Sequence, residues 1–252
     1  GEKAESQIWR LNHLYTIVDK EGKNRIFEFN WAQQELHKNL HYSNIILKAR
    51  QLGITTYVCM LFLDVCIWMP NIAAGIIAHT REDAEYIFKR IKYAYDQLPD
   101  FIKNACTANI SSARELVFNN NSSLRVGTSM RGSTLQYLHI SEFGKICAHF
   151  PDKAREIVTG SLNTIGSKQY VFIESTAEGK EGYFYDLCKQ AEAVKIANKK
   201  LSTIDYRFHF FPWYKCPDYV LNEQINIPKE IEEYFEKLRL QNIDLDAEQK
   251  SW

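Results

Sequence analysis

The chain has 252 residues, 45% of them hydrophobic and 25% charged, and its 31 basic and 31 acidic residues give a formal net charge of zero. That composition is typical of a globular protein with a full core, and it gives no overall attraction to nucleic acid or to a membrane surface. Six cysteines without a C-x-x-C pair argue against a disulfide framework and a zinc site. No apolar run is long enough to span a bilayer, so we expect an intracellular protein without a membrane partner.

The first part of the chain, residues 1–29, has the pattern of an extension. Two apolar segments, residues 14–18 and 25–29, flank a turn around Gly22 and predict a hairpin. Asn30 then caps a short helix over residues 31–40. This helix carries Gln33, whose amide could form the paired contacts that read an adenine edge. A solvated helix face is the alternative for this glutamine.

The stretch from Asn44 to Thr56 has the layout of a phosphate-binding loop, with a short strand, a polar turn containing Gly53 and the start of a helix. Backbone N–H groups of such a loop attract an anion, and a threonine hydroxyl can bind Mg²⁺. The strict pattern G-x-x-x-x-G-K-[ST] is not met, because Lys48 replaces the first glycine and Ile54 replaces the lysine. Thr55 keeps the hydroxyl position, and the flexible Lys48 side chain can reach the β- and γ-phosphates. An ordinary strand–turn–helix connection is the alternative.

Strands and helices alternate through the rest of the chain. The predicted strands cover residues 73–78, 115–118, 124–126, 135–140, 170–174 and 205–211, and the predicted helices cover residues 81–98, 151–160 and 182–196 and a segment from residue 228. Such alternation predicts βαβ units, and therefore an α/β fold with a mainly parallel central sheet flanked by helices. Residues 115–118 and 124–126 predict an antiparallel hairpin at its edge.

Polar residues follow two further strands. Ser141 and Glu142 end the strand over residues 135–140, and in nucleotide hydrolases such a pair holds a Mg²⁺-bound water and activates the attacking water. The usual aspartate of the first position is a serine here. Ser175 and Thr176 end the strand over residues 170–174, where they could sense a γ-phosphate. Open α/β sheets bind ligands at the carboxyl ends of their strands, so the three polar clusters favour a nucleotide site.

Taken in order, these segments resemble the ATPase half of the large terminase subunit, the motor that packages DNA in tailed bacteriophages. The segments that carry the resemblance are residues 30–33, 48–56, 131–134, 140–143, 174–179 and 211–213. It implies a P-loop NTPase fold of the ASCE/RecA-like class, with residues 30–225 as the ATPase domain. Residues 226–252 would then be a helical linker toward a C-terminal nuclease domain that this chain lacks.

Carried over to this chain, the resemblance implies a role for each matched residue. Lys48 would supply the phosphate-binding charge, Thr55 would ligate Mg²⁺ with support from Ser141, and Glu142 would be the catalytic carboxylate. Ser175 and Thr176 would couple hydrolysis to motion, and Arg131 would act on a neighbouring subunit's nucleotide. The implied ATP-binding set is Gln33, Lys48, Arg50, Gln51, Gly53, Ile54, Thr55 and Thr56.

The implied function is hydrolysis of ATP with Mg²⁺ to drive double-stranded viral DNA into the procapsid. The implied partners are DNA, other copies of the chain in a ring, the portal protein and the small terminase subunit, in the cytoplasm of the bacterial host. Two alternatives remain open. One is a helicase-like translocase, which needs a second RecA-like domain, and the other is a docking module whose altered loop no longer hydrolyses ATP.

Overall fold

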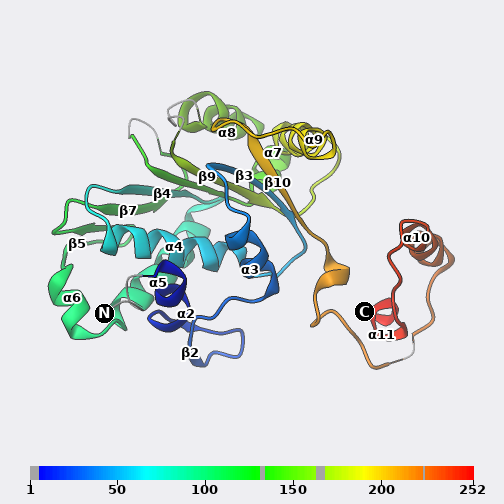
Figure 1. Ribbon diagram of the computed structural model, residues 1–252, viewed down its shortest axis with the longest axis horizontal. Helices are drawn as coiled ribbons and strands as arrows, with labels where there is room; N and C mark the ends of the chain where they lie inside the picture. The colour runs from blue at the N-terminus through cyan, green and yellow to red at the C-terminus, as the bar shows by residue number, and fades with distance from the viewer. Residues whose placement is uncertain (1–5, 131–133, 163–167, 224) are drawn as a thin grey trace. The chain divides into compact units, whose positions relative to one another are not determined.

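The computed structural model describes residues 6–130, 134–162, 168–223 and 225–252. Its central element is an eight-stranded sheet with the spatial order β10-β3-β9-β8-β4-β7-β6-β5 (Figure 1). The strands are β3 Ser43–Lys48, β4 Ala73–Ile77, β5 Ala108–Ser111, β6 Glu115–Phe118, β7 Ser123–Gly127, β8 Tyr137–Ser141, β9 Tyr170–Ser175 and β10 Tyr206–Phe211. Strands β3, β9, β8, β4 and β7 pair in parallel, whereas β6 and β5 are antiparallel at one edge. The predicted α/β fold, its mainly parallel sheet and its antiparallel edge are confirmed.

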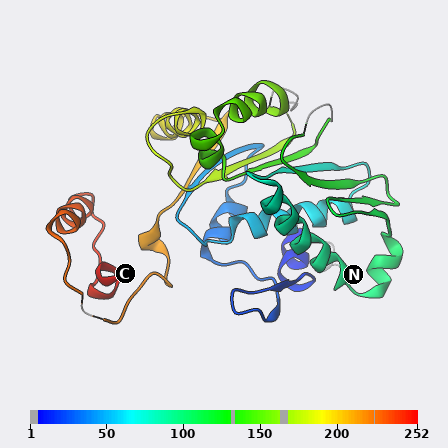
Figure 2. The same ribbon diagram turned by 180° about the vertical axis from the view of Figure 1, so that it is seen from behind.

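Helices cover both faces of the sheet (Figures 1 and 2). One face carries α3 (Trp31–Lys38), α4 (Ile54–Trp68) and α5 (Arg81–Asp96), and the other carries α7 (Phe143–His149), α8 (Pro151–Glu156) and α9 (Tyr183–Ile196). Helix α4 is buried from Tyr57 to Ile67, because it lies between the sheet and the elements outside it. Its nearly continuous apolar sequence fits that position.

The structure also holds elements that the sequence pattern did not predict. These are α2 (Gln7–His13), α6 (Asp100–Ala105), β5 and α7. The helix expected over residues 151–160 is α8 followed by a π-helical turn over Ile157–Leu162. The N-terminal hairpin is present as β1 (Thr16–Val18) and β2 (Asn24–Ile26), with shorter strands than expected, and its turn contains Gly22 at φ +78°. The expected turn is confirmed.

A buried ion pair ties the N-terminal extension to α4. The Arg10 guanidinium donates to both carboxylate oxygens of Asp64, at 2.8 and 2.7 Å, and the Tyr15 hydroxyl donates to Asp64 Oδ1 at 2.7 Å. Asp64 is completely buried, and the Arg10 guanidinium also stacks over the Trp68 ring. The three donors satisfy a carboxylate that would otherwise be costly inside an apolar helix.

We expect Asp64→Ala to lower the free energy of unfolding by about 3–5 kcal/mol, because it leaves the Arg10 charge buried without its partner. The matched control is Asp96→Ala, which removes an exposed ion pair with Lys92 one turn away and should cost about 0.5 kcal/mol or less. Urea unfolding followed by circular dichroism measures both. Equal costs for the two variants would contradict the anchoring role of Asp64.

The chain divides into two compact units, Gly1–Phe210 and Phe211–Trp252. The second unit contains α10 (Lys229–Arg239), the helix predicted from residue 228, and a further short helix, α11 (Ala247–Ser251). A capping box between Asp246 and Gln249 begins α11, and Trp252 stacks on Tyr219 with 4.1 Å between ring centroids. No helix in the described ranges is long and apolar enough to cross a membrane.

Candidate active site

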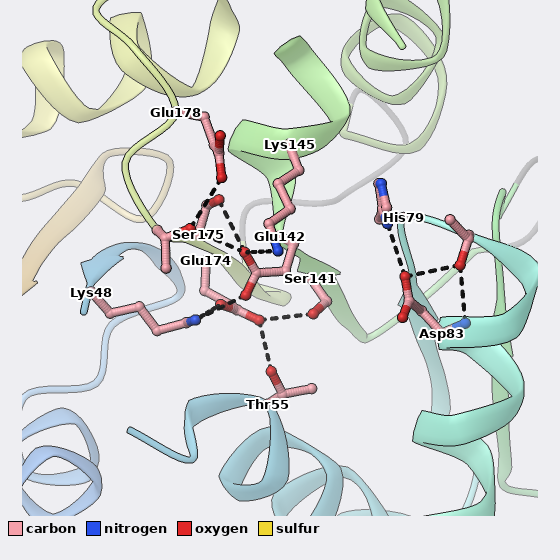
Figure 3. Close-up of polar contacts among 12 residues, drawn as sticks. Lys48, Thr55, His79, Asp83, Ser141, Glu142, Lys145, Glu174, Ser175 and Glu178 are labelled. Carbon is pink, nitrogen blue, oxygen red and sulfur yellow. Dashed lines mark hydrogen bonds and ion pairs between the residues drawn. The ribbon is translucent and has the colours of Figure 1, made fainter. Parts of the chain in front are cut away.

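The predicted site residues lie at the carboxyl ends of three adjacent parallel strands. Lys48 ends β3, Ser141 ends β8 and Ser175 ends β9. The strand register places Ser141 opposite Glu174 and Leu47 opposite Ser175, so these strand ends lie side by side. The first turn of α4 faces the same group of side chains (Figure 3). Residues far apart in the sequence therefore form one polar cluster.

Lys48 lies between two carboxylates. Its Nζ is 3.0 Å from Glu142 Oε1 and 3.1 Å from Glu174 Oε2, and the lysine side chain is only 6% exposed. Burial alone would lower the pKa of Lys48, but the negative charges of Glu174 and Glu142 outweigh burial and raise that pKa. The side chain is therefore a firmly charged ammonium group at neutral pH, and one of its two partners, Glu142, is partly open to solvent.

Glu174 is the buried centre of the cluster. Its Oε1 accepts hydrogen bonds from Ser141 Oγ at 2.8 Å and from Thr55 Oγ1 at 2.9 Å (Figure 3). Burial alone would raise the pKa of Glu174, but the Lys48 ammonium, the neighbouring His139 ring and the Ser141 hydroxyl hold that pKa far below its ordinary value. The carboxylate is ionised although it is completely buried. Glu174 is the last residue of the strand predicted over residues 170–174, and the sequence pattern indicated no role for it.

His139 is buried on β8 beside this carboxylate, with its Nε2 3.4 Å from Glu174 Oε1. Neither ring nitrogen makes a well-aligned hydrogen bond to any residue in the described part of the chain. The ring packs edge-on against Phe62 of α4. An apolar strand pattern alone predicts a core histidine here, and only the strand register reveals its contact with a charged group.

Glu142 has a left-handed backbone conformation with φ +52° and immediately precedes α7. Such conformations are uncommon for residues other than glycine, and they are concentrated at functional sites. Glu142 Oε2 lies 3.5 Å from the hydroxyls of both Ser175 and Thr176, and 3.7 Å from Lys145 Nζ. The predicted catalytic carboxylate and the predicted coupling residues are therefore in direct contact (Figure 3).

Helix α3 holds the loop between β3 and α4. Asn30 and Gln33 form a capping box at the start of α3. Asn30 Nδ2 then donates to Leu52 O at 3.0 Å, and Gln33 Nε2 donates to Gly53 O at 2.9 Å. Gln33 is buried, with its amide already bonded to the loop. Its predicted contact with adenine stays a prediction, whereas its support of the loop is a feature that the sequence did not indicate.

The other predicted ATP-binding residues have different surroundings. Ile54 is 1% exposed, so its side chain is packed in the core and offers no group to a ligand. Thr56 Oγ1 accepts a hydrogen bond from Arg90 at 3.2 Å and is turned to α5. Arg50 and Gln51 are exposed on the loop, where Gln51 has φ +55°. Arg131 lies outside the described residues.

We expect Gly53→Ala to destabilise the loop, since Gly53 has φ +68° and an added Cβ would lie 2.7 Å from Gln33 Nε2. The left-handed backbone costs an alanine about 1–2 kcal/mol, and loss of the Gln33 hydrogen bond adds about 1 kcal/mol. The control is Gly22→Ala, which has φ +78° with open space around it. Urea unfolding should show a larger cost for Gly53→Ala than for Gly22→Ala, and equal costs would refute the role of the Gln33 contact.

The donor set of the cluster fits Mg²⁺ with a nucleotide. Thr55, Ser141, Glu142 and Glu174 offer hydroxyl and carboxylate oxygens, and Mg²⁺ in nucleotide sites uses one or two carboxylates together with waters and phosphates. Among the described residues, no group of three or more histidine, cysteine or acidic side chains is arranged so that it could hold a metal ion by itself. Gly53, the N-cap residue of α4, has no capping side chain, and the first turn of α4 lacks acidic residues. That helix end favours an anion.

Comparisons with known proteins agree with this architecture. No protein-family model and no curated protein matches the sequence. Two solved structures of the large terminase ATPase domain of Thermus phage P74-26 are similar to the chain, with TM-scores of 0.52 and 0.51 and identities of 17% and 18%. They cover 85% and 89% of this chain, which in turn covers 89% and 93% of them.

The large terminase of bacteriophage HK97 is also similar, with a TM-score of 0.61 and 15% identity over 99% of this chain. The chain spans 50% of the length of that protein. At these identities the likeness concerns the fold. The chain therefore has the α/β fold seen in these phage large terminase structures.

Proposed function

We propose that this chain is the ATPase motor domain of a phage large terminase, which hydrolyses ATP with Mg²⁺ to move double-stranded DNA into the procapsid. The observation that carries the proposal is the buried Lys48 ammonium between Glu142 and Glu174, at the strand ends that face the start of α4. A charged lysine, an activating carboxylate and an open helix N-terminus are the parts that phosphoryl transfer requires.

Each residue has a task in this proposal. Lys48 binds the β- and γ-phosphates, and the first-turn N–H groups of α4 bind the same anion. Thr55 and Ser141 hold the metal, and Mg²⁺, when bound, neutralises charge on the phosphate oxygens. Glu142 orients and deprotonates the attacking water.

Ser175 and Thr176 contact Glu142, which gives a direct route from the reacting group to β9 and the chain beyond it. Arg50 and Gln51 are exposed beside the loop, where they can contact phosphate from the solvent side. Arg131 remains our candidate for the arginine that acts on a neighbouring subunit's nucleotide. An arginine supplied in this way is worth about 10³–10⁵ in rate in other nucleotide hydrolases.

We also propose that the chain works as a ring of copies on the portal protein, together with the small terminase subunit, in the cytoplasm of the bacterial host. Residues 226–252 would connect the ATPase domain to a nuclease domain. The similarity to phage large terminases supports these partners only at the level of fold.

The first experiment is calorimetric titration of the 252-residue chain with ATP in the presence of Mg²⁺. We expect saturable binding with one nucleotide per chain. Absence of binding at millimolar ATP would overturn the motor and favour the docking module. A second measurement, phosphate release with and without duplex DNA, then tests the motor function, because a packaging ATPase should be stimulated by DNA.

A further inference from the structure

The carboxylate of Glu174 is completely buried near the end of β9. A buried charge is costly unless several groups offset it. Here the offsetting groups are the Lys48 ammonium and the hydroxyls of Ser141 and Thr55. These are the residues that the proposed function assigns to phosphate and metal, so Glu174 lies inside that site and not beside it.

The strand register explains how Glu174 reaches this point. Glu174 and Ser141 are paired positions of the parallel strands β9 and β8, so their side chains lie on the same face of the sheet. That face is covered by α4, because Phe62 packs against His139 and Phe172, the residues two positions earlier on each strand. The Glu174 carboxylate therefore lies next to the Ser141 side chain, in the region that an aspartate side chain at position 141 would occupy.

P-loop nucleotide hydrolases hold Mg²⁺ with a P-loop hydroxyl and an aspartate from another part of the chain. This chain has Thr55 for the first group and only a serine, Ser141, for the second. We propose that Glu174 supplies the missing carboxylate from β9 and positions the Mg²⁺ of bound ATP. This role of Glu174 rests on the proposed function, because it completes the Mg²⁺ site of the proposed ATPase.

The hydrogen bonds of the cluster support this assignment. The hydroxyls of Thr55 and Ser141 both donate to Glu174 Oε1, so the three candidate metal-binding groups converge on one point. Glu174 Oε2 accepts no well-aligned hydrogen bond from the described residues, and Lys48 balances its charge from 3.1 Å. An oxygen with free lone pairs beside two hydroxyls is suited to receive a metal-bound water.

The competing explanation is that Glu174 serves only as the counter-ion of Lys48. The two roles differ in one measurable quantity, the ratio of the ATP dissociation constant in EDTA to that in Mg²⁺. A counter-ion alters ATP binding equally with and without metal, so this ratio stays constant when it is removed. A metal-positioning carboxylate changes the ratio itself, because it acts only when Mg²⁺ is bound.

The test uses calorimetry of the whole chain and its variants with ATP, in EDTA and in Mg²⁺. For Glu174→Gln we expect the ratio to fall about 10- to 100-fold, the usual loss when a group that orients a metal is removed. Binding in EDTA should not weaken, since Lys48 loses a competing carboxylate. The charge-loss control is Glu21→Gln in the hairpin turn, which should keep the wild-type ratio. Mn²⁺ electron paramagnetic resonance of the ATP complex provides a second readout without turnover.

A double variant provides a second measurement in case Glu174→Gln does not fold. Ser141→Asp combined with Glu174→Ser keeps the net charge and moves the carboxylate to β8, so we expect it to restore the wild-type ratio. A ratio that is unchanged in Glu174→Gln, or not restored in a folded double variant, overturns the role of Glu174 while leaving the ATPase intact. If the wild-type chain binds ATP neither in Mg²⁺ nor in EDTA, that result instead overturns the proposed function.

Discussion

Lys48→Ala is expected to weaken Mg²⁺-dependent ATP binding about 10- to 100-fold, because a hydrogen-bonded charge at a buried phosphate site is worth about 1.5–3 kcal/mol. The variant also leaves Glu142 and Glu174 without their shared ammonium. The two carboxylates would then repel the incoming phosphates, which adds to the loss. Calorimetric titration with ATP measures the effect directly.

Two further variants make this result specific. Lys48→Arg keeps the charge and should retain part of the binding. Lys145→Ala removes a lysine that is 3.7 Å from Glu142 and 38% exposed, and it should change the affinity by about fivefold or less, because an exposed pair contributes about 1 kcal/mol or less. If Lys145→Ala weakened ATP binding as much as Lys48→Ala, the effect would come from the total positive charge near Glu142 and not from a specific contact between Lys48 and phosphate.

Glu142→Gln is expected to lower ATP turnover about 10²- to 10⁴-fold while ATP binding remains, since loss of a positioned general base removes that much of the rate. The amide keeps the size of the side chain but cannot accept the proton of the attacking water. Phosphate release gives the rate and calorimetry gives the affinity. The measurement requires duplex DNA and a protein concentration that permits assembly, because a neighbouring subunit's arginine belongs to the proposed mechanism.

The control for this prediction is Glu178→Gln. Glu178 lies 3.4 Å from Thr176 Oγ1 and forms no ion pair with Lys48, so its loss should leave turnover within about threefold of the wild-type rate. Equal turnover in wild type and Glu142→Gln would remove Glu142 as the base. A parallel loss of binding and turnover would instead show that Glu142 acts through the position of Lys48.

Much of the fold follows from local patterns. The apolar run before Lys48 and the run before Ser141 became β3 and β8, the two parallel strands that flank β9, because short, fully apolar segments are typical of strands buried on both faces of a sheet. Asn30 began α3 because its side chain satisfies a backbone N–H of the first turn. The polar ends of these strands met at one edge, as the rule for open α/β sheets predicts.

The features that the sequence did not reveal depend on long-range pairing. Glu174 ends an apolar strand, and nothing local distinguishes it from a solvated carboxylate until the register places it beside Ser141. Helix α7 begins after Glu142, which has a left-handed backbone conformation. Its Gly144 packs so close to β9 that an added Cβ would lie 2.8 Å from Ser175 Oγ. Such a close approach is a tertiary effect, and a glycine inside a short apolar segment does not predict it.

The polar cluster joins parts of the chain that are distant in sequence, since Lys48 and Glu142 are 94 positions apart and Thr55 and Glu174 are 119 apart. Such a site exists only when β3, β9 and β8 are already paired, because no shorter fragment brings these groups together. Ligand binding and folding are therefore linked: a nucleotide at 100 times its dissociation constant adds about 2.7 kcal/mol to the stability of the native state. The melting temperature of the chain should rise with ATP concentration, and that rise reports the integrity of the central sheet as much as the affinity of the site.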